Sequence, residues 1–456
     1  MPEAGAKARD FRARVSVGAA GAAGVAAGAV RVDAGGVDCA EGPAGPLRVD
    51  FGEVESLERA ELRVGLKLFD GTTVAFDHGG SLDDLWDTLR RAFLARVSDS
   101  LRFGPADPRH TFDARVALEG EGGFAATPAR LSVTRLGLNY LAESGPCAQL
   151  PFGSLGEAAF DAPAYEVAVP VLAGPAAPRG AVLRIAKLAQ RTDEFQALLR
   201  EARRASLADT ARCLSDLAPK LGAAQRVALA NELTVGRMVS RERCEAVAPD
   251  AWRMLWDAAA GAGRAGYRDA LEAASAGPAG MFLGLMPHGG SEPVAEGASE
   301  EPADASNGEA ADSASWDASP PVSGGDSEPG EDSPYPVVYA AVVLPGASPA
   351  KDRLALEVLS ERDHATYVYR TAPSPAGADR AAAGAWLAAA VSHTLLGLNF
   401  RKEPLYLPEE QLMQARERLY RAALRRLPGL RELRARLLGR AIHSGPAAWK
   451  KQLEGL

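Results

Sequence analysis

The chain has 456 residues, of which 47% are hydrophobic and 24% are charged, so its composition is that of an ordinary soluble globular protein with room for about three domains. The net charge is −8 at pH 7, but twelve acidic residues fall between positions 289 and 333, where no lysine or arginine occurs. Residues 401–456 show the opposite imbalance, with thirteen basic and six acidic residues. No run reaches the roughly 18 apolar residues that a membrane-spanning helix requires, so no transmembrane segment is expected.

The cysteines favour a reducing setting. The four of them lie far apart and form no Cys-x-x-Cys motif, so neither a disulfide framework nor a zinc site is expected, and a cytoplasmic location fits best. A signal peptide is the alternative for the N-terminus, because two arginines precede the Ala/Gly-rich run at 18–30. We favour a structural role for this run, since its counterpart returns well inside the chain.

The first 155 residues contain an internal repeat. A shift of 101 residues, with no gap, aligns residues 11–15 (FRARV) with 112–116 (FDARV). The same shift aligns three further pairs: Val32 with Val133, Gly36 with Gly137, and Phe51 with Phe152. Such a repeat predicts two similar folding units in tandem, which we place at residues 11–97 and 112–204.

The first unit opens with short β-rich segments and ends in a hairpin and a helix. The expected strands lie at 11–17, 30–33, 37–40 and 47–51. In the hairpin at 62–77, a three-residue loop with Gly71 at positive φ would pair Leu66 with Val74. A two-residue Asp-Gly loop would instead turn Val74 and Phe76 to the other face, so we prefer the longer loop.

An amphipathic helix should close this unit. Ser81 is a candidate cap, and Asp83 and Asp84 fall in the first turn, where the helix dipole favours negative charge. The apolar positions form one stripe: Leu82, Leu85, Trp86, Leu89 and Phe93. We expect this stripe to cover the open end of a strongly bent sheet.

The second unit follows the same order. Its later hairpin joins residues 165–172 to 181–188 through a longer loop, and valines at 167, 169 and 171 alternate onto one face. The longer loop raises the offset between the two helices to about 113. Thr192 is the expected cap of the second helix.

Short antiparallel strands closed by one amphipathic helix resemble the pleckstrin-homology-like (PH-like) barrel. The segments 129–134 (ARLSVT), 137–141 (GLNYL) and 150–152 (LPF) look like the opening strands of such a domain. Two of them in tandem, with GLKL at 65–68 and an acidic segment further on, are similar to the structure-specific recognition subunit of a eukaryotic histone chaperone. The resemblance implies an α+β multidomain fold with two tandem PH-like β-barrels, each closed by a C-terminal helix.

The remaining chain should form a helical middle and a third α+β unit. Residues 206–277 have helical periodicity, and Trp252, Leu255 and Trp256 are expected to pack the helices against the second barrel. An exposed aromatic docking helix is the alternative. Residues 279–400 are predicted to form strands followed by a helix. Within them, the acidic segment 289–334 is too poor in apolar residues to fold and is expected to be a disordered insertion between strands.

Basic helices are expected at the C-terminus, over residues 401–456, with an interruption at Pro428-Gly429. Their arginines could form a solvated face, contact the acidic segment, or bind nucleic acid or an anionic membrane. No phosphate-binding loop, nucleophile elbow or metal-ligand cluster occurs, and the His residues are scattered. We interpret Asp363-His364 as a turn, and an enzyme centred on His364 and Glu361 is the weakest hypothesis.

These observations predict a non-enzymatic intracellular adaptor that uses its PH-like domains to bind a protein partner or phospholipid. The alternative is a nucleic-acid-associated factor that binds through the basic tail. No catalytic, cofactor-binding or metal-binding residue is assigned, and no cofactor is expected. The candidate residues for binding an anion or a partner are Arg48, Arg63, Lys67, Arg425, Arg426 and Arg434.

Overall fold

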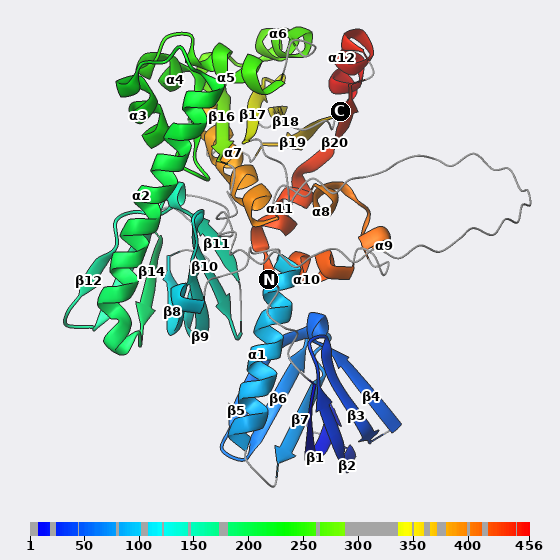
Figure 1. The fold of residues 1–456 in the computed structure, drawn as a ribbon. Coiled ribbons are helices and arrows are strands. Elements are labelled where there is room, and N and C mark those ends of the chain that lie inside the picture. The colour runs from blue at the N-terminus through cyan, green and yellow to red at the C-terminus, as the bar shows by residue number, and fades with distance from the viewer. Residues whose placement is uncertain are drawn as a thin grey trace, which may run out of the picture.

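The computed structural model describes residues 8–18, 24–43, 45–78, 82–101, 108–120, 123–144, 147–172, 181–260, 265–287, 336–348, 351–359, 365–371, 380–398, 402–412, 418–443 and 445–456. Three antiparallel sheets dominate this part of the chain (Figure 1). The acidic segment 289–334, Ser81 and the Asp363-His364 pair lie outside the described residues. No helix of the described chain is long and apolar enough to cross a membrane.

The first sheet has seven strands in the order β4-β3-β2-β1-β7-β6-β5, and it curls into a half-barrel around α1 (Leu82–Leu101). Its strands are β1 (Arg9–Gly18), β2 (Gly24–Val32), β3 (Gly36–Gly42), β4 (Gly45–Asp50), β5 (Val54–Ala60), β6 (Arg63–Leu68) and β7 (Thr73–His78), with the 3-10 helix η1 (Phe51–Glu53) between β4 and β5. The Ala/Gly-rich run therefore contributes to β2. Strand β5 was not anticipated from the sequence.

The β6–β7 hairpin has the predicted three-residue loop. Leu66 pairs with Val74, Val64 pairs with Phe76, and Gly71 has φ +88°. All four paired side chains are buried in the core, where the predicted stripe of α1 meets them. Loop length thus sets the register that keeps one face apolar.

The second sheet repeats the first strand for strand. Its order is β11-β10-β9-β8-β14-β13-β12, and α2 (Thr192–Leu217) takes the place of α1. Its elements are η2 (Pro108–His110), β8 (Thr111–Glu119), β9 (Phe124–Val133), β10 (Gly137–Ala142), β11 (Ala148–Pro151), η3 (Phe152–Ser154), β12 (Ala159–Asp161), β13 (Glu166–Val171), β14 (Ala181–Ala186) and η4 (Ala189–Arg191). Equivalent cross-strand pairs are Val32–Val37 and Val133–Leu138, Val37–Val49 and Leu138–Leu150, and Val15–Phe76 and Val116–Ile185. The predicted repeat is therefore confirmed at the level of strand register.

Two details of α2 differ from expectation. Thr192 is the first helical residue and not the cap, because its hydroxyl donates to the carbonyl of Ala189 at 2.8 Å. The helix also continues without a break to Leu217, well past the second sheet. It leads into the helices that cover the third sheet (Figure 1).

The third sheet is an antiparallel meander in the order β15-β16-β17-β18-β19-β20. Its strands are β15 (Met238–Ser240), β16 (Met281–Met286), β17 (Val337–Leu344), β18 (Arg353–Val358), β19 (Ala365–Arg370) and β20 (Leu437–Ile442). Because β16 and β17 are hydrogen-bonded neighbours, the acidic segment is an insertion between adjacent strands, as predicted. Strand β17 is apolar throughout because helices cover both faces of the sheet.

The two helical layers on the third sheet come from different parts of the chain. One face carries α3 (Ala223–Glu232), α4 (Arg241–Val247), α5 (Ala251–Ala260), α6 (Ala265–Ala274) and α12 (Pro446–Gly455), with η6 (Pro278–Gly280) leading into β16. The other carries α7 (Arg380–Gly397), α8 (Glu403–Tyr406) and α11 (Pro428–Arg436). Trp252, Leu255 and Trp256 are buried against the third sheet, so their expected packing on the second barrel was wrong.

The C-terminal part is not entirely helical. Helices α9 (Glu409–Leu412), α10 (Arg418–Arg426) and α11 are followed by β20, which pairs with β19. The Leu/Arg-rich sequence has good helical propensity, but the free edge of β19 offers hydrogen-bond partners that outweigh it. Pro428 begins α11, where its missing N–H is not needed.

Gly384 tests how closely α7 lies on the third sheet. It is a buried glycine in mid-helix, and a methyl group at this position would overlap Cγ2 of Val343 on β17. Alanine should gain about 1 kcal/mol in helix propensity but lose about 1–3 kcal/mol through overpacking against a stiff β-branched side chain. We predict that Gly384→Ala lowers the midpoint of urea unfolding. The matched control is Gly397→Ala at the end of the same helix, where a methyl group meets nothing within 4 Å and the midpoint should stay or rise.

Candidate functional site

The three candidate cations of the first sheet are each paired with carboxylates. Arg48 on β4 contacts Asp33 at 2.8 Å and also Asp38, and its hydrogen bonds hold the pKa of Asp33 below its usual value. The hydrogen bonds that the Arg48 guanidinium donates to Asp33 and Asp38 raise its own pKa. Strand β4, which carries Arg48, lies at one edge of the first sheet, and in the strand order it is far from β6, which carries the other two cations.

On β6, Arg63 and Lys67 have partners on the neighbouring strands. Nε of Arg63 lies 2.7 Å from a carboxylate oxygen of Asp77, and Nζ of Lys67 lies 2.8 Å from Glu55. These pairings raise the pKa of both cations. The structure therefore does not gather the three cations into one anion site, and each already has an anionic partner.

The candidate arginines of the tail point inward. Arg434 donates to the backbone carbonyl of Leu407 at 2.8 Å and to that of Pro404, so it ties α11 to the segment after α8. Arg425 forms an ion pair of 2.6 Å with Glu53 and lies over the ring of Phe69 at 4.7 Å. These side chains serve contacts within the chain.

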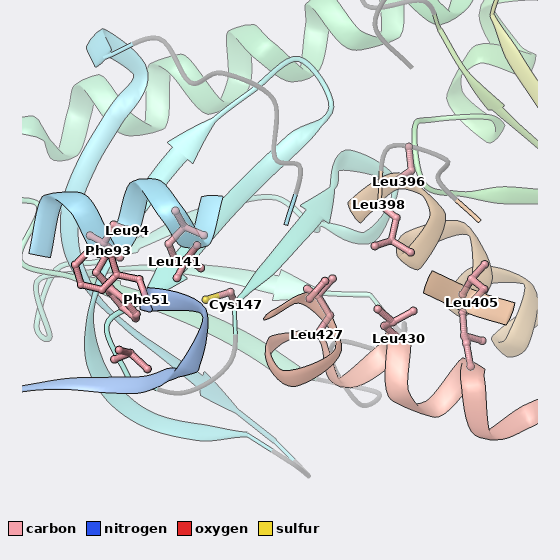
Figure 2. Packing of buried hydrophobic residues seen from close by; sticks show 14 of the residues in the cluster. Phe51, Phe93, Leu94, Leu141, Cys147, Leu396, Leu398, Leu405, Leu427 and Leu430 are labelled. Atoms are coloured by element: carbon pink, nitrogen blue, oxygen red, sulfur yellow. The ribbon is translucent and has the colours of Figure 1, made fainter. Parts of the chain in front are cut away.

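Arg426 lies at the junction of the first sheet, the second sheet and the tail. Its side chain is 3% exposed, and it donates to the carbonyl of Val54 at 2.5 Å. Its guanidinium carbon lies 4.9 Å from the ring centre of Phe93. Its own carbonyl accepts from the amide of Cys147, whose thiol has a pKa raised by burial. Figure 2 shows Cys147 between Phe51 and Phe93 on one side and Leu427 on the other.

A second buried network holds the third sheet to α12. The hydroxyl of Thr366 contacts Glu357, Nε2 of His443 lies 3.0 Å from the same carboxylate, and Nε1 of Trp449 donates to Thr366 at 2.7 Å. Glu357 and Thr366 both contact Nε2 of His443. In a catalytic triad the acid and the hydroxyl bind opposite ring nitrogens, so this network does not have that arrangement. Sequence reasoning missed the network, although a glutamate inside an apolar strand was a signal for it.

A surface hollow among the described residues lies on the second sheet, on the face opposite its core. It encloses about 430 Å³, and small residues form its floor: Ala117, Ala126, Ala164 and Ala186. Longer charged side chains form its walls: Arg115, Glu119, Asp161, Glu166 and Arg184. These residues share a face because direct cross-strand partners point the same way, as in the row Asp161–Glu166–Ala186–Arg115.

The charge of the hollow is unbalanced. Arg184 lies 2.5 Å from Glu119, 3.7 Å from Asp161 and 3.9 Å from Glu166. Arg184 thus faces three carboxylates, and with Arg115 the lining has two guanidinium groups against three carboxylates, which leaves an excess of one negative charge. Its hydrogen bond to Glu119 raises the pKa of Arg184.

An exposed aromatic pair lies on β12 and its turn, and because Phe160 pairs with Val167, its ring is on the opposite face of the sheet from the hollow. Phe160 on β12 and Tyr165 in the following turn pack edge to face with ring centres 5.5 Å apart, and they are 41% and 58% exposed. Tyr165 has φ +54°, a conformation that a non-glycine residue rarely adopts. A strained, exposed aromatic residue next to a hollow is a feature of binding surfaces.

Comparison of the chain with models of known families finds no match, and none of the curated proteins matches it either. Within the described residues no group of His, Cys, Asp and Glu side chains is arranged to hold a metal ion. The site is therefore interpreted from its own geometry.

Arg426 should be the most sensitive of the six candidate residues to truncation. Arg426→Ala removes the donor to Val54 and leaves a cavity between two aromatic rings, so we expect a loss of about 3 kcal/mol in unfolding free energy. Arg426→Met keeps much of the volume without a buried charge and should cost less. Urea unfolding followed by circular dichroism measures both. The control Arg431→Ala, on the exposed side of α11, should change the free energy by under about 0.5 kcal/mol; equal effects of all three would contradict this role.

His393 on α7 should make stability depend on acid. Burial lowers its pKa to about 4, from an ordinary value of 6.5. Above pH 6.5 the ring is neutral in both states. Below it the unfolded chain binds a proton that the folded chain does not, so stability should fall by up to about 3 kcal/mol as the pH drops toward 4.

The measurement is the urea midpoint at pH 7.5 and at pH 5, followed by tryptophan fluorescence. Trp252, Trp256 and Trp449 are buried around the third sheet, so the signal reports on the region that contains α7. His393→Leu should lose less stability between the two pH values than the unmodified chain. An unchanged pH dependence would show that other groups account for it.

Proposed function

We propose that the protein is a non-enzymatic adaptor whose two curled sheets are tandem PH-like barrels. The seven-stranded order, the matching register and the single helix that closes each sheet support this interpretation. The same tandem arrangement underlies the likeness to the histone chaperone subunit. Fold alone does not specify a ligand, so the function is argued from the surface of the second sheet.

The hollow, with the aromatic pair on the other face of β12, is the observation that carries the proposal. Charged walls and a floor of small side chains lie on one face of β12 and an exposed aromatic pair lies on the other, and together they suit a protein surface better than a small reactive substrate. None of the residues that line the hollow forms a nucleophile–base pair. A binding role therefore uses the features that are present.

A protein partner is favoured over phospholipid. A lipid phosphate would have to displace Asp33 from Arg48, Asp77 from Arg63 or Glu55 from Lys67, which are already charge-matched. Unpaired cations would be needed for an efficient headgroup site. Arg48, Arg63 and Lys67, the cations predicted for such a site, form intramolecular ion pairs instead.

Nucleic-acid binding through the tail is the second candidate, and the orientation of the tail argues against it. Arg425, Arg426 and Arg434 contact the chain itself, so the local positive charge is partly used within the fold. Exposed basic residues do occur at Arg431 and Arg440. They lie on α11 and β20, which belong to the packed structure and cannot be removed as a detachable tail.

The proposal places the protein in a reducing, intracellular compartment. All four cysteines are free, and three of them, Cys39, Cys147 and Cys244, are buried. Burial raises the pKa of Cys39 to about 11 and that of Cys244 to about 12, so neither is poised as a thiolate. This chemistry suits core residues.

Filling the hollow should abolish partner binding. Ala117→Trp places a large ring on the floor, whereas Ala40→Trp puts the same ring on an exposed position of the first sheet and serves as the control. Full-length variants are used for quantitative co-purification after crosslinking in cells. We expect partners recovered with the unmodified chain to fall at least about tenfold with Ala117→Trp alone.

Two results would oppose this function. Recovery unaffected by Ala117→Trp, in a variant whose urea midpoint is unchanged, would remove the hollow from partner binding. The chain could instead bind a 30-base-pair duplex and lose that affinity when Arg431 and Arg440 are changed to glutamate. That result would favour the nucleic-acid candidate.

A further inference from the structure

The edge strand of the first sheet already accepts an extended segment of backbone. The amide of Leu57 on β5 donates to the carbonyl of Glu143 at 3.2 Å, and Ser56 forms an antiparallel bridge with Ser144. These partners belong to the segment that follows β10 of the second unit. The chain thus shows which kind of group this edge receives.

The equivalent edge of the second sheet is β12, and it has no such neighbour. The repeat aligns β5 with residues 155–161, since η1 and η3 precede them at the same spacing. Across the described chain, β12 pairs with β13 and with no other strand. It lies at the outer border of the second sheet, away from the third sheet (Figure 1).

The backbone of Phe160 faces away from β13. The amide of Gly156 donates to the carbonyl of Pro170, and the amide of Leu172 donates to the carbonyl of Ser154. The backbone carbonyl of Pro170, on β13, therefore points toward the side of the sheet where β12 lies. Because the direction of the backbone N–H and carbonyl alternates along a strand, those of Ala168, which pairs with Ala159, also point toward β12. Ala159 and Asp161 therefore bond toward β13, and the N–H and carbonyl of Phe160 point outward.

The side chains around this edge specify the chemistry of a ligand. Three carboxylates against the two guanidinium groups of Arg184 and Arg115 leave one negative charge in excess, which favours an additional cation in the hollow. The exposed Phe160–Tyr165 pair favours an apolar side chain next to it. Direct cross-strand partners share a face and successive residues alternate, so the residue of an added strand opposite Phe160 lies on the face of its ring, while a flanking residue opposite Ala159 or Asp161 points to the face of the hollow.

We propose that β12 binds an extended segment of a partner protein as an additional antiparallel or parallel strand. A lysine or arginine of that segment occupies the hollow beside Asp161 and Glu166, and an apolar residue packs on Phe160 and Tyr165. Main-chain hydrogen bonds supply affinity and the two side chains supply selectivity. This inference rests on the proposed adaptor function and names the class of its partner.

Other edges and a second copy fit this role less well. Strand β4, at the opposite border of the first sheet, contains Pro46, which lacks an amide donor and is typical of a protected edge. Two copies joined through β12 would bring Asp161 and Glu166 of each chain near their own counterparts, and like charges oppose such pairing.

The experiment uses the full-length protein and a phage-displayed library of random twelve-residue peptides. Enriched sequences should carry a basic residue near an apolar one and lack proline at their centre. Synthetic copies are then titrated by fluorescence anisotropy against variants of β12. Phe160→Ala removes the ring, whereas Phe160→Pro removes both the ring and the outward amide, so Phe160→Pro should weaken binding further, by at least about tenfold in total.

Charge reversal tests the hollow separately. Asp161→Lys combined with Glu166→Lys should weaken the selected peptides at least about tenfold and should strengthen copies in which glutamate replaces the basic residue. Glu58→Lys on β5, an exposed position of the equivalent strand, is the matched control and should leave both affinities unchanged. Urea midpoints verify that each variant is folded.

Each alternative outcome overturns the inference in a distinct way. Selection of acidic peptides, no enrichment, or equal binding by the Phe160→Ala and Phe160→Pro variants would reject strand addition. Concentration-dependent dimerisation lost in Phe160→Pro would assign the edge to a second copy. If partners are lost with Ala117→Trp but retained with Phe160→Pro, strand addition at β12 is rejected and the adaptor function is kept. If partners are retained with both variants, strand addition and the adaptor function are both rejected.

Discussion

A buried guanidinium holds together parts of the chain that are distant in sequence. Arg426, on α10, donates to Val54 at the start of β5 and lies between Phe69 and Phe93, while its carbonyl accepts from Cys147 of the second unit. Burying a charge is costly unless hydrogen bonds and polarizable groups compensate it. Here the carbonyls of Val54 and Glu55 and two aromatic rings provide part of that compensation, while Nε and Nη1 have no hydrogen-bond partner among the described residues. These contacts bind the first sheet, the second sheet and the tail to one geometry. Around this contact a single hydrophobic cluster extends from the first sheet to one face of the third (Figure 2).

The two repeated units use the same edge for different purposes. In the first unit that edge accepts residues 143–144 and so helps to fix the second unit in place. Within the described residues, the equivalent strand β12 of the second unit pairs with β13 alone, and the surface next to it carries charged side chains and an exposed aromatic pair. Duplication of a fold thus allows one copy to use an edge for a structural contact that the other copy does not make.

Much of the fold could be predicted from the sequence because its signals are local. The repeat spacing, the Gly71 loop and the alternating valines of β13 each depend on neighbouring residues, and the structure confirms all three. The hollow could not be predicted in this way. Its floor joins Ala117 on β8 with Ala186 on β14, and their proximity depends on pairing between strands far apart in the chain.

The tail shows a second limit of sequence reasoning. Composition reveals that it is basic, but not which side of a short helix is buried, so it could not show that Arg425 and Arg426 contact the first sheet. The sequence predicts a helix at β20 because its partner strand β19 lies some 70 residues earlier, so the residues next to β20 do not indicate the pairing. Non-local pairing decided both outcomes.

The pairing of Met286 with Val337 gives the third sheet an unusual tolerance. These residues close the ladder between β16 and β17, so the chain leaves and re-enters the sheet at neighbouring points. The entropy of closing such an excursion grows only slowly, by about 0.6 kcal/mol for each doubling of its length. The sheet is therefore nearly indifferent to how many residues lie between the two strands. This position can accept a reporter domain, or shed most of its acidic segment, with little effect on the strands that flank it.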